Sequence, residues 1–207
     1  MIYLIITTSI YNKYGQENRE ENRENRENRY IEAITESLKH IPVRTIIVEN
    51  NGKRETFLDT FVSDTVSVLY TNNNIHDFKN KGINEMLDIK EVIRYYDICD
   101  DDIIIKLTGR YKVISPLFLN EIDENYDAFV KFFGVSSLKY EKYDCILGCY
   151  AMRTKYLKLF NYLSIANYQS AEVAFAKYTK LCGCRLKEIE KLDLECLFSD
   201  NLKKLIV

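Results

Sequence analysis

Short, mostly apolar runs alternate with amphipathic stretches through the first half of the chain. The runs lie at 2–6, 43–48, 66–70 and 103–107. Such runs are typical of strands buried on both faces of a sheet. Between them, apolar residues recur at three- and four-residue spacing over 30–41 and 80–96, which predicts helices, and Leu58 and Phe61 indicate a shorter one. This alternation predicts a Rossmann-like α/β fold with a mostly parallel central sheet flanked by helices.

The second half of the chain continues the pattern less regularly. Strand-like runs lie at 126–133 and 145–152, and helical patterns follow near 155–163 and 171–180. No change of composition marks a domain boundary. We therefore expect one domain over 1–207, with a ligand-binding half at 1–115 and a second half at 116–207.

A low-complexity tract at 16–29 repeats the unit Glu-Asn-Arg and interrupts this pattern. It contains five Glu and four Arg and has no apolar face. Such a tract either extends a solvated helix through Glu/Arg pairs or stays mobile. We interpret it as a tolerated insertion, although its arginines also suit an anionic ligand.

Composition narrows the class of protein. The 207 residues are 46% hydrophobic and 13% aromatic, which allows a sizeable core and argues against a largely disordered chain. The net charge of −2 gives no argument for nucleic-acid binding. No apolar run is long enough to span a membrane, and the first residues lack the features of a signal peptide. We therefore expect a soluble, cytoplasmic protein whose six cysteines are reduced thiols rather than zinc ligands.

Polar residues follow each of the four early strands. In an open α/β sheet, ligands bind outside the carboxyl ends of the strands. Hydroxyl, amide, carboxylate and guanidinium groups on one edge suit a nucleotide, although turn residues also gather at strand ends for structural reasons. The polar segments are Thr7-Thr8-Ser9, Glu49-Asn50, Asn72-Asn73-Asn74 and Thr108-Gly109-Arg110.

The sequence lacks the motifs of several other nucleotide-binding enzymes and of hydrolases with a Ser/His or Cys/His pair. No Gly-x-Gly-x-x-Gly follows the first strand, and no Gly-Lys-Ser/Thr segment occurs, which argues against dinucleotide oxidoreductases and P-loop enzymes. The two histidines, His40 and His76, lie near no recognisable nucleophile motif.

The order of these motifs resembles the small, family-2-like glycosyltransferases of the GT-A fold. The resemblance rests on Ile-Ile-Thr-Thr-Ser, Ile-Ile-Val-Glu-Asn-Asn, Tyr-Thr-Asn-Asn, Asn-Lys-Gly-Ile-Asn-Glu and Lys-Leu-Thr-Gly-Arg-Tyr, in that order over residues 1–115. It implies transfer of a sugar from a nucleotide-diphosphate sugar, with a UDP-sugar favoured, to a glycan or other hydroxyl acceptor. The donor-binding residues that it implies are Thr7, Thr8, Ser9, Glu49, Asn50, Asn73, Asn80, Lys81, Thr108 and Gly109. The Asn-rich, repeat-bearing sequence also resembles proteins that large DNA viruses encode for glycan biosynthesis, which would place the enzyme in the host cytoplasm.

The chain departs from this family at the metal site. Enzymes of the GT-A fold usually carry Asp-x-Asp at the end of the fourth strand, where Mn²⁺ or Mg²⁺ bridges carboxylate and diphosphate. Here Asp100-x-Asp102 precedes the strand, and Thr108-Gly109-Arg110 stands at the expected position. A guanidinium binds phosphate directly, so we expect Arg110 to stabilise the leaving diphosphate at a site that depends on a metal weakly or not at all. If the strand assignment were off by one element, Asp100 and Asp102 would be the metal ligands instead.

The resemblance also implies an acceptor side. Inverting enzymes need a carboxylate that takes the proton of the acceptor hydroxyl, and Glu172, in the first turn of a predicted helix, suits that role. A glutamate there also complements the helix dipole, which is a purely structural alternative. Gly148 is expected to allow close approach of the acceptor sugar, and Tyr150 to stack on it.

Two other functions stay open at this point. A sugar nucleotidyltransferase uses a similar sheet, but the Gly-rich, basic loop after the first strand is missing. A catalytically silent module that binds a nucleotide-sugar or a protein is the third hypothesis, and the displaced Asp-x-Asp supports it.

Overall fold

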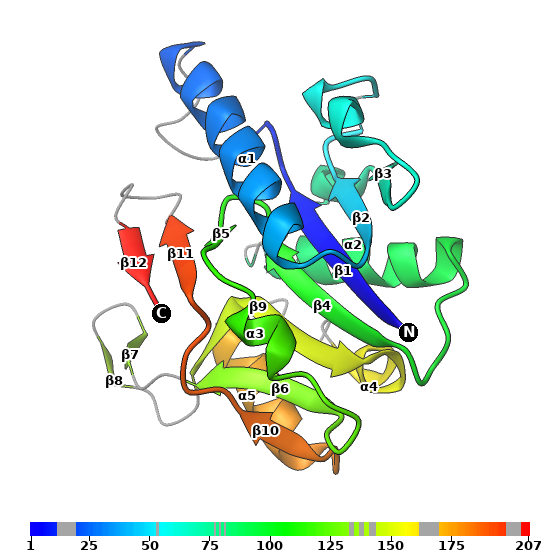
Figure 1. Ribbon diagram of the computed structural model, residues 1–207, viewed down its shortest axis with the longest axis vertical. Helices are drawn as coiled ribbons and strands as arrows, with labels where there is room; N and C mark the ends of the chain where they lie inside the picture. The colour runs from blue at the N-terminus through cyan, green and yellow to red at the C-terminus, as the bar shows by residue number, and fades with distance from the viewer. Residues whose placement is uncertain are drawn as a thin grey trace.

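The computed structural model of the protein describes residues 1–11, 20–52, 54–76, 78, 80, 82–132, 135–136, 139–140, 144–161, 170–197 and 204–207. Its centre is a seven-stranded sheet in the order β10-β6-β9-β4-β1-β2-β3 (Figure 1). The strands are β1 (Ile2–Thr8), β2 (Arg44–Glu49), β3 (Val66–Tyr70), β4 (Ile103–Thr108), β6 (Ala128–Phe132), β9 (Cys145–Arg153) and β10 (Leu186–Glu188).

Only β9 runs against the other strands of this sheet. It pairs antiparallel with both β4 and β6, whereas β1 pairs parallel with β2 and β4, and β2 pairs parallel with β3. The prediction of a mostly parallel α/β sheet is therefore confirmed. Because β9 is reversed, its first residues lie at the same edge as the last residues of β4.

Helices cover both faces of the sheet and give it two cores. One core packs under α1 (Glu20–His40), the 3₁₀ helix η2 (Phe57–Phe61) and α3 (Leu117–Asn120). The other packs under α2 (Gly82–Tyr95), α4 (Thr154–Leu159) and α5 (Ala171–Leu181). Successive strand side chains alternate between the two cores, as Ile104 and Ile105 do on β4. This is why the strands read as nearly continuous apolar runs.

Several short elements escape the sequence pattern. They are η3 (Asn73–Ile75), β5 (Lys112–Val113), β7 (Val135–Ser136), β8 (Lys139–Tyr140), β11 (Leu194–Leu197) and β12 (Lys204–Ile206). β12, β11 and β5 form a small sheet beside α1, whereas β7 and β8 pair with each other (Figure 1). Runs of two to four residues are too short to show any periodicity.

The described part of the Glu-Asn-Arg tract is helical. α1 begins at Glu20, ten residues before the apolar, buried Tyr30. Of the two alternatives, the structure therefore shows the extended helix for residues 20–29. No helix among the described residues is both long and apolar enough to cross a membrane.

Candidate functional site at the carboxyl edge of the sheet

The strand ends named in the sequence analysis meet at one edge. Register pairs Thr7 of β1 with Thr108 of β4, Thr8 with Glu49 of β2, and Glu49 with Tyr70 of β3. Thr7, Thr8, Glu49, Asn50 and Thr108 are all buried there, whereas Ser9, Asn73, Asn80 and Arg110 are partly exposed. The predicted residue Lys81 lies outside the described residues.

Glu49 is a buried carboxylate that joins two of these loops. It accepts hydrogen bonds from the Thr8 hydroxyl at 2.6 Å, from the backbone amide of Ile10, and from the backbone and side-chain amides of Asn51. Burial raises the pKa of Glu49, and these hydrogen bonds oppose the rise. Its contacts therefore organise the loops after β1 and β2 from within.

A second buried carboxylate, Asp88 in the middle of α2, joins the next pair of loops. It accepts from Asn50 Nδ2 at 2.9 Å, from the Thr71 hydroxyl at 2.8 Å and from Asn73 Nδ2 at 2.8 Å. Burial raises the pKa of Asp88 to about 7. Sequence reasoning missed Asp88, although an aspartate on the apolar face of a predicted helix is a signal in itself.

Lys106 places a buried ammonium group under the end of β4. Its Nζ lies 2.5 Å from Glu85 Oε2, and donates to Thr108 Oγ1 at 2.7 Å and to the Leu147 carbonyl at 3.1 Å. Its side chain is 1% exposed and that of Glu85 is 30% exposed. These three acceptors match the three donors of an ammonium group. Lys106, the only charged residue of β4, thus joins α2, the end of β4 and β9 beneath the carboxyl edge.

Tyr111 provides an aromatic ring at this edge. A Cβ atom on Gly148 would lie 2.0 Å from that ring, so only glycine leaves room for it. Burial raises the pKa of the Tyr111 phenol, and the negative charges of Glu85 and Glu172 raise it further. Tyr111 therefore lies within the electrostatic reach of both glutamates.

Glu172 is exposed in the first turn of α5. The Ser170 hydroxyl caps that helix by accepting from the Val173 amide, and donates to Glu172 Oε2 at 2.5 Å. The start of α5 packs against the start of α2, because a Cβ on Gly82 would lie 2.6 Å from the Ala171 methyl group. The Asn80 side chain accepts from the Gly82 amide at 3.0 Å and so begins α2 beside the same spot.

Arg110 faces a cavity on the α1 side of the sheet. The cavity has a volume of about 260 Å³ and is lined by α1, by the segment from Arg110 to Lys112, and by β11 and β12. Lys112 pairs there with Glu32 at 2.7 Å and with Glu195 at 3.6 Å. Within the described part of the chain, the buried Nε of Arg110 makes no hydrogen bond, whereas the guanidinium is hydrogen-bonded with Tyr30. One N–H donor of Arg110 is thus without a described partner at the end of β4.

The structure corrects the acceptor-side prediction for Tyr150. This residue is fully buried, lies on the face toward α2 and α5, and packs its ring 4.4 Å from that of Phe175. It therefore has no surface on which a sugar stacks. Gly148 was expected to allow close approach of the acceptor sugar, which stays a prediction; the group that approaches it in the structure is the Tyr111 ring.

The structure also removes the alternative metal ligands. Asp100 and Asp102 lie before β4, at the amino edge, where Asp100 pairs with Lys158 at 2.6 Å and Asp102 accepts from the Cys99 amide. At the end of β4 the Lys106 ammonium is already bound by Glu85, Thr108 and the Leu147 carbonyl, and Arg110 stands at the position of the expected Asp-x-Asp motif. A guanidinium at that position does not suit a divalent cation. Among the described residues, no group of three or more His, Cys, Asp or Glu side chains is placed to hold a metal ion.

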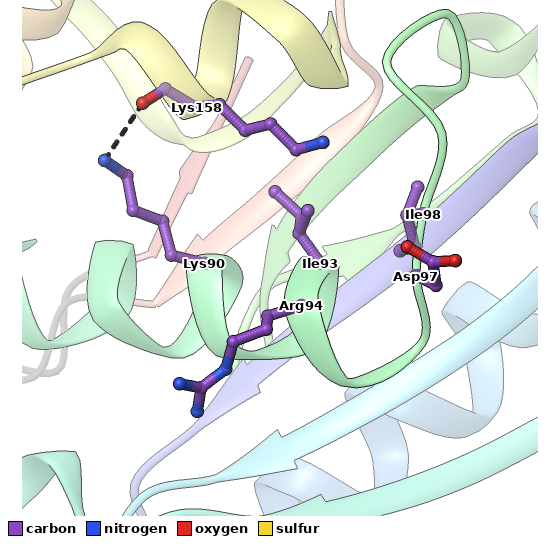
Figure 2. A pocket seen from close by; sticks show the side chains of 6 residues that line it. All are labelled: Lys90, Ile93, Arg94, Asp97, Ile98 and Lys158. Atoms are coloured by element: carbon purple, nitrogen blue, oxygen red, sulfur yellow. Dashed lines mark hydrogen bonds between the residues drawn. The ribbon is translucent and has the colours of Figure 1, made fainter.

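Another cavity, of about 370 Å³, lies away from the carboxyl edge. Figure 2 shows its lining, in which Lys90 of α2 reaches toward α4 and donates to the Lys158 carbonyl, at 3.2 Å. Lys90 also donates to the carbonyl of Phe160, which follows α4, at 3.2 Å. Ile93 and Ile98 supply its apolar wall. The lysine satisfies carbonyls at the end of α4, so its role here is structural.

Comparison with solved structures identifies the architecture. A proposed nucleotide-diphospho-sugar transferase from Desulfovibrio desulfuricans G20 matches 91% of this chain and 79% of its own, with a TM-score of 0.57 and 8% identity. The galactosyltransferase LgtC with donor and acceptor sugar analogues matches 86% of this chain and 70% of its own, with a TM-score of 0.47 and 10% identity. A 4-diphosphocytidyl-2C-methyl-D-erythritol synthase matches 89% and 86%, with a TM-score of 0.48 and 14% identity.

No protein-family model and no curated protein matches the sequence. At such low identity, a structural match speaks for the fold and leaves the reaction to be argued from the site. Of the three structures, only the first exceeds a TM-score of 0.5. The chain has the GT-A-like, Rossmann-related fold seen in that nucleotide-diphospho-sugar transferase.

Proposed function

We propose that the protein is a glycosyltransferase that moves a sugar from a nucleotide-diphosphate sugar, with a UDP-sugar favoured, to a hydroxyl group of a glycan acceptor. One observation carries the proposal. The polar carboxyl edge of β1–β4, the guanidinium of Arg110 after β4, and the exposed Glu172, whose backbone carbonyl accepts from Cys145 at the start of β9, belong to one edge of the sheet. A nucleoside, a diphosphate and an acceptor hydroxyl need these three kinds of surface.

The donor side consists of the partly exposed groups of the edge. Ser9, Asn73 and Asn80 offer hydroxyl and amide groups to the nucleoside, and the buried residues behind them fix the loops. Thr108 Oγ1 accepts a hydrogen bond from Lys106, so its own proton is directed away from the ammonium. Arg110 supplies guanidinium donors for the diphosphate, which suits an oxyanion better than a lysine does.

The proposed reaction is a single displacement with inversion. Glu172 takes the proton of the acceptor hydroxyl while its oxygen attacks the anomeric carbon. The bond between that carbon and the diphosphate oxygen breaks, and the electron pair leaves with the nucleotide diphosphate. Arg110 stabilises the charge that develops on the leaving group. The chain's own guanidinium serves this step, and no step requires a metal ion.

Replacing Glu172 by Gln tests the base. A general base contributes about 10²- to 10⁴-fold to a rate, so we expect E172Q to lose at least 10²-fold in sugar transfer. The donor dissociation constant, measured by calorimetry, should change less than about twofold, because the carboxylate serves the acceptor. E188Q is the matched control, since Glu188 is an exposed glutamate of β10 that pairs with Lys180 of α5.

The outcomes separate the hypotheses. If E172Q keeps the wild-type transfer rate, Glu172 only stabilises the start of α5. If no UDP-, GDP- or dTDP-sugar binds the wild-type protein, the site is not a donor site and a protein-binding module takes its place. A product that contains a nucleotide newly joined to a sugar phosphate would instead indicate a nucleotidyltransferase.

A further inference from the structure

Asp88 is a buried carboxylate whose three hydrogen-bond donors are all neutral. Two are the amides of Asn50 and Asn73, and the third is the hydroxyl of Thr71. A buried carboxylate that is bonded by neutral groups keeps its charge less readily than one that faces a cation. Its side chain has no solvent exposure.

The titratable groups around Asp88 do not favour its charge. Glu85 lies on the same helix and raises the pKa of Asp88, and Glu91, one turn further, shares the Asn73 amide with it at 3.0 Å. Glu49 ends β2 directly before Asn50, and His76 follows η3. Burial, reinforced by Glu85, brings the pKa of Asp88 to about 7. Both protonation states are therefore populated near neutral pH.

Asn50 has one atom without a partner, and that atom matters for this equilibrium. Its Nδ2 donates to Asp88 Oδ2 at 2.9 Å, whereas its Oδ1 is buried and accepts no hydrogen bond from any residue that the structure describes. Rotating the amide by half a turn exchanges the two atoms. The rotated amide would repel an ionised carboxylate, but it would accept the O–H proton of a protonated one. Two hydrogen-bonded arrangements thus differ by one proton taken up from solvent.

We propose that Asp88 and Asn50 form a proton-operated amide switch that makes nucleotide binding at the carboxyl edge depend on pH. Asp88 is then a positioning residue, because it acts through Asn50 and Asn73. In its ionised form it holds both amides by their NH₂ groups, and Asn73 is partly exposed at the edge. Protonation turns one carboxylate oxygen of Asp88 from an acceptor into an O–H donor, which allows the Asn50 amide to rotate. The effect on nucleotide binding rests on the proposed function, whereas the switch itself does not.

The first experiment follows the switch without any ligand. The side-chain NH₂ resonances of Asn50 and Asn73 are recorded by NMR between pH 5.5 and 8.5. We expect an inflection near pH 7 in the wild-type protein, and none in D88N, which keeps the shape of the side chain. E91Q and E49Q are matched controls on the two neighbouring carboxylates, and both should retain the inflection. A wild-type protein without the inflection, or D88N with it, would overturn the switch.

The second experiment links the switch to binding. UDP is titrated calorimetrically into the wild-type protein and D88N at pH 8 and pH 6. Couplings between sites commonly reach fivefold or more, so we expect the wild-type affinity to fall by about fivefold at pH 6. The affinity of D88N should change much less. If the wild-type protein binds UDP equally well at both pH values, the switch does not control nucleotide binding.

The NMR inflection tests the amide switch and nucleotide binding tests the proposed function, so each can be contradicted without the other. If the Asn50 inflection is present but UDP, GDP and dTDP all fail to bind, the proposed function is wrong and the amide switch stands without it. If UDP binds and no inflection is present, the switch is wrong and the proposed function is unaffected.

Discussion

Single side chains at the carboxyl edge each hold several neighbouring segments in place. Lys106 shows this most clearly, since it fixes Glu85, Thr108 and the Leu147 carbonyl at once. A buried ammonium that loses its carboxylate is costly, whereas replacing both partners by apolar groups is often nearly neutral. The Lys106–Glu85 pair can therefore be tested both by how much stability a single variant loses and by whether a second substitution restores stability or lowers it further.

We expect E85A to destabilise the protein more than the double variant E85A/K106M does. In E85A the ammonium stays buried with two neutral acceptors, which we expect to cost about 2–3 kcal/mol in the free energy of unfolding. The double variant removes the buried charge and should recover part of that loss. Urea unfolding at pH 7 measures all the variants. A double variant less stable than E85A would show that Lys106 contributes mainly through Thr108 and Leu147.

Residue-scale prediction from the sequence succeeded where position along a strand decides the outcome. Thr8, Glu49 and Thr108 were placed correctly at one edge because the ends of parallel strands must meet there. It failed for Tyr150, because alternation along β9 turns that ring into the core while Cys149 faces the other side. One sequence does not reveal which face of a strand buried on both sides meets which helix.

At the scale of elements, Asp127 joins three strands of the second half. It directly precedes β6 and accepts from Arg153 at the end of β9 at 2.8 Å, and from the backbone amide of Arg185, just before β10, at 3.0 Å. The Arg185 guanidinium also bonds it at 2.9 Å. These bonds hold the pKa of Asp127 well below its usual range. No pattern in the sequence predicts this junction, because its partners are 26 and 58 residues away.

We expect D127N to lower the free energy of unfolding by about 2 kcal/mol at pH 7. Because the folded-state pKa of Asp127 is depressed, its contribution is fully present above the unfolded pKa of about 4 and is lost as the pH falls through the folded value. The difference between wild type and D127N should thus narrow from pH 5 toward pH 2. Denaturant unfolding along this pH series measures it, and a constant difference would contradict the assigned cause.

Most long elements followed from periodicity, since β1–β4, α2 and α5 fall within a few residues of their expected ranges. Periodicity did not reveal the direction of β9, because an apolar run reads the same both ways. That direction nevertheless matters for the site, since it brings Gly148 to the Tyr111 ring.

For the whole molecule, the proposed function requires the carboxyl edge to neutralise a diphosphate. The end of β4 supplies Arg110 at the place where the resemblance to GT-A glycosyltransferases leads one to expect metal-binding carboxylates. Charge provided by the chain itself does not depend on added metal.

We expect nucleotide-diphosphate sugars to raise the thermal midpoint equally with Mn²⁺ and with EDTA. A ligand at 100 times its dissociation constant adds about 2.7 kcal/mol to stability, which is readily seen in a melting curve. R110M should lose most of this stabilisation, whereas R94M, on an exposed turn of α2, should keep it. A shift that disappears with EDTA would mean that a metal ion takes part after all.

The described part of the Glu-Asn-Arg tract forms the first turns of α1, a helical arm that leads to Arg26 and Tyr30. Arg26 donates to the Ser9 carbonyl at 2.6 Å, and the apolar, buried Tyr30 follows. Each further copy of the unit ahead of Arg26 would lengthen a helix by about 4.5 Å without moving either residue. Gene replication readily gains and loses copies of short repeats, and such slippage here would change only the reach of the arm. We therefore expect related chains to differ in the number of repeats, and so in the length of α1, while Arg26 and Tyr30 keep their positions beside the carboxyl edge.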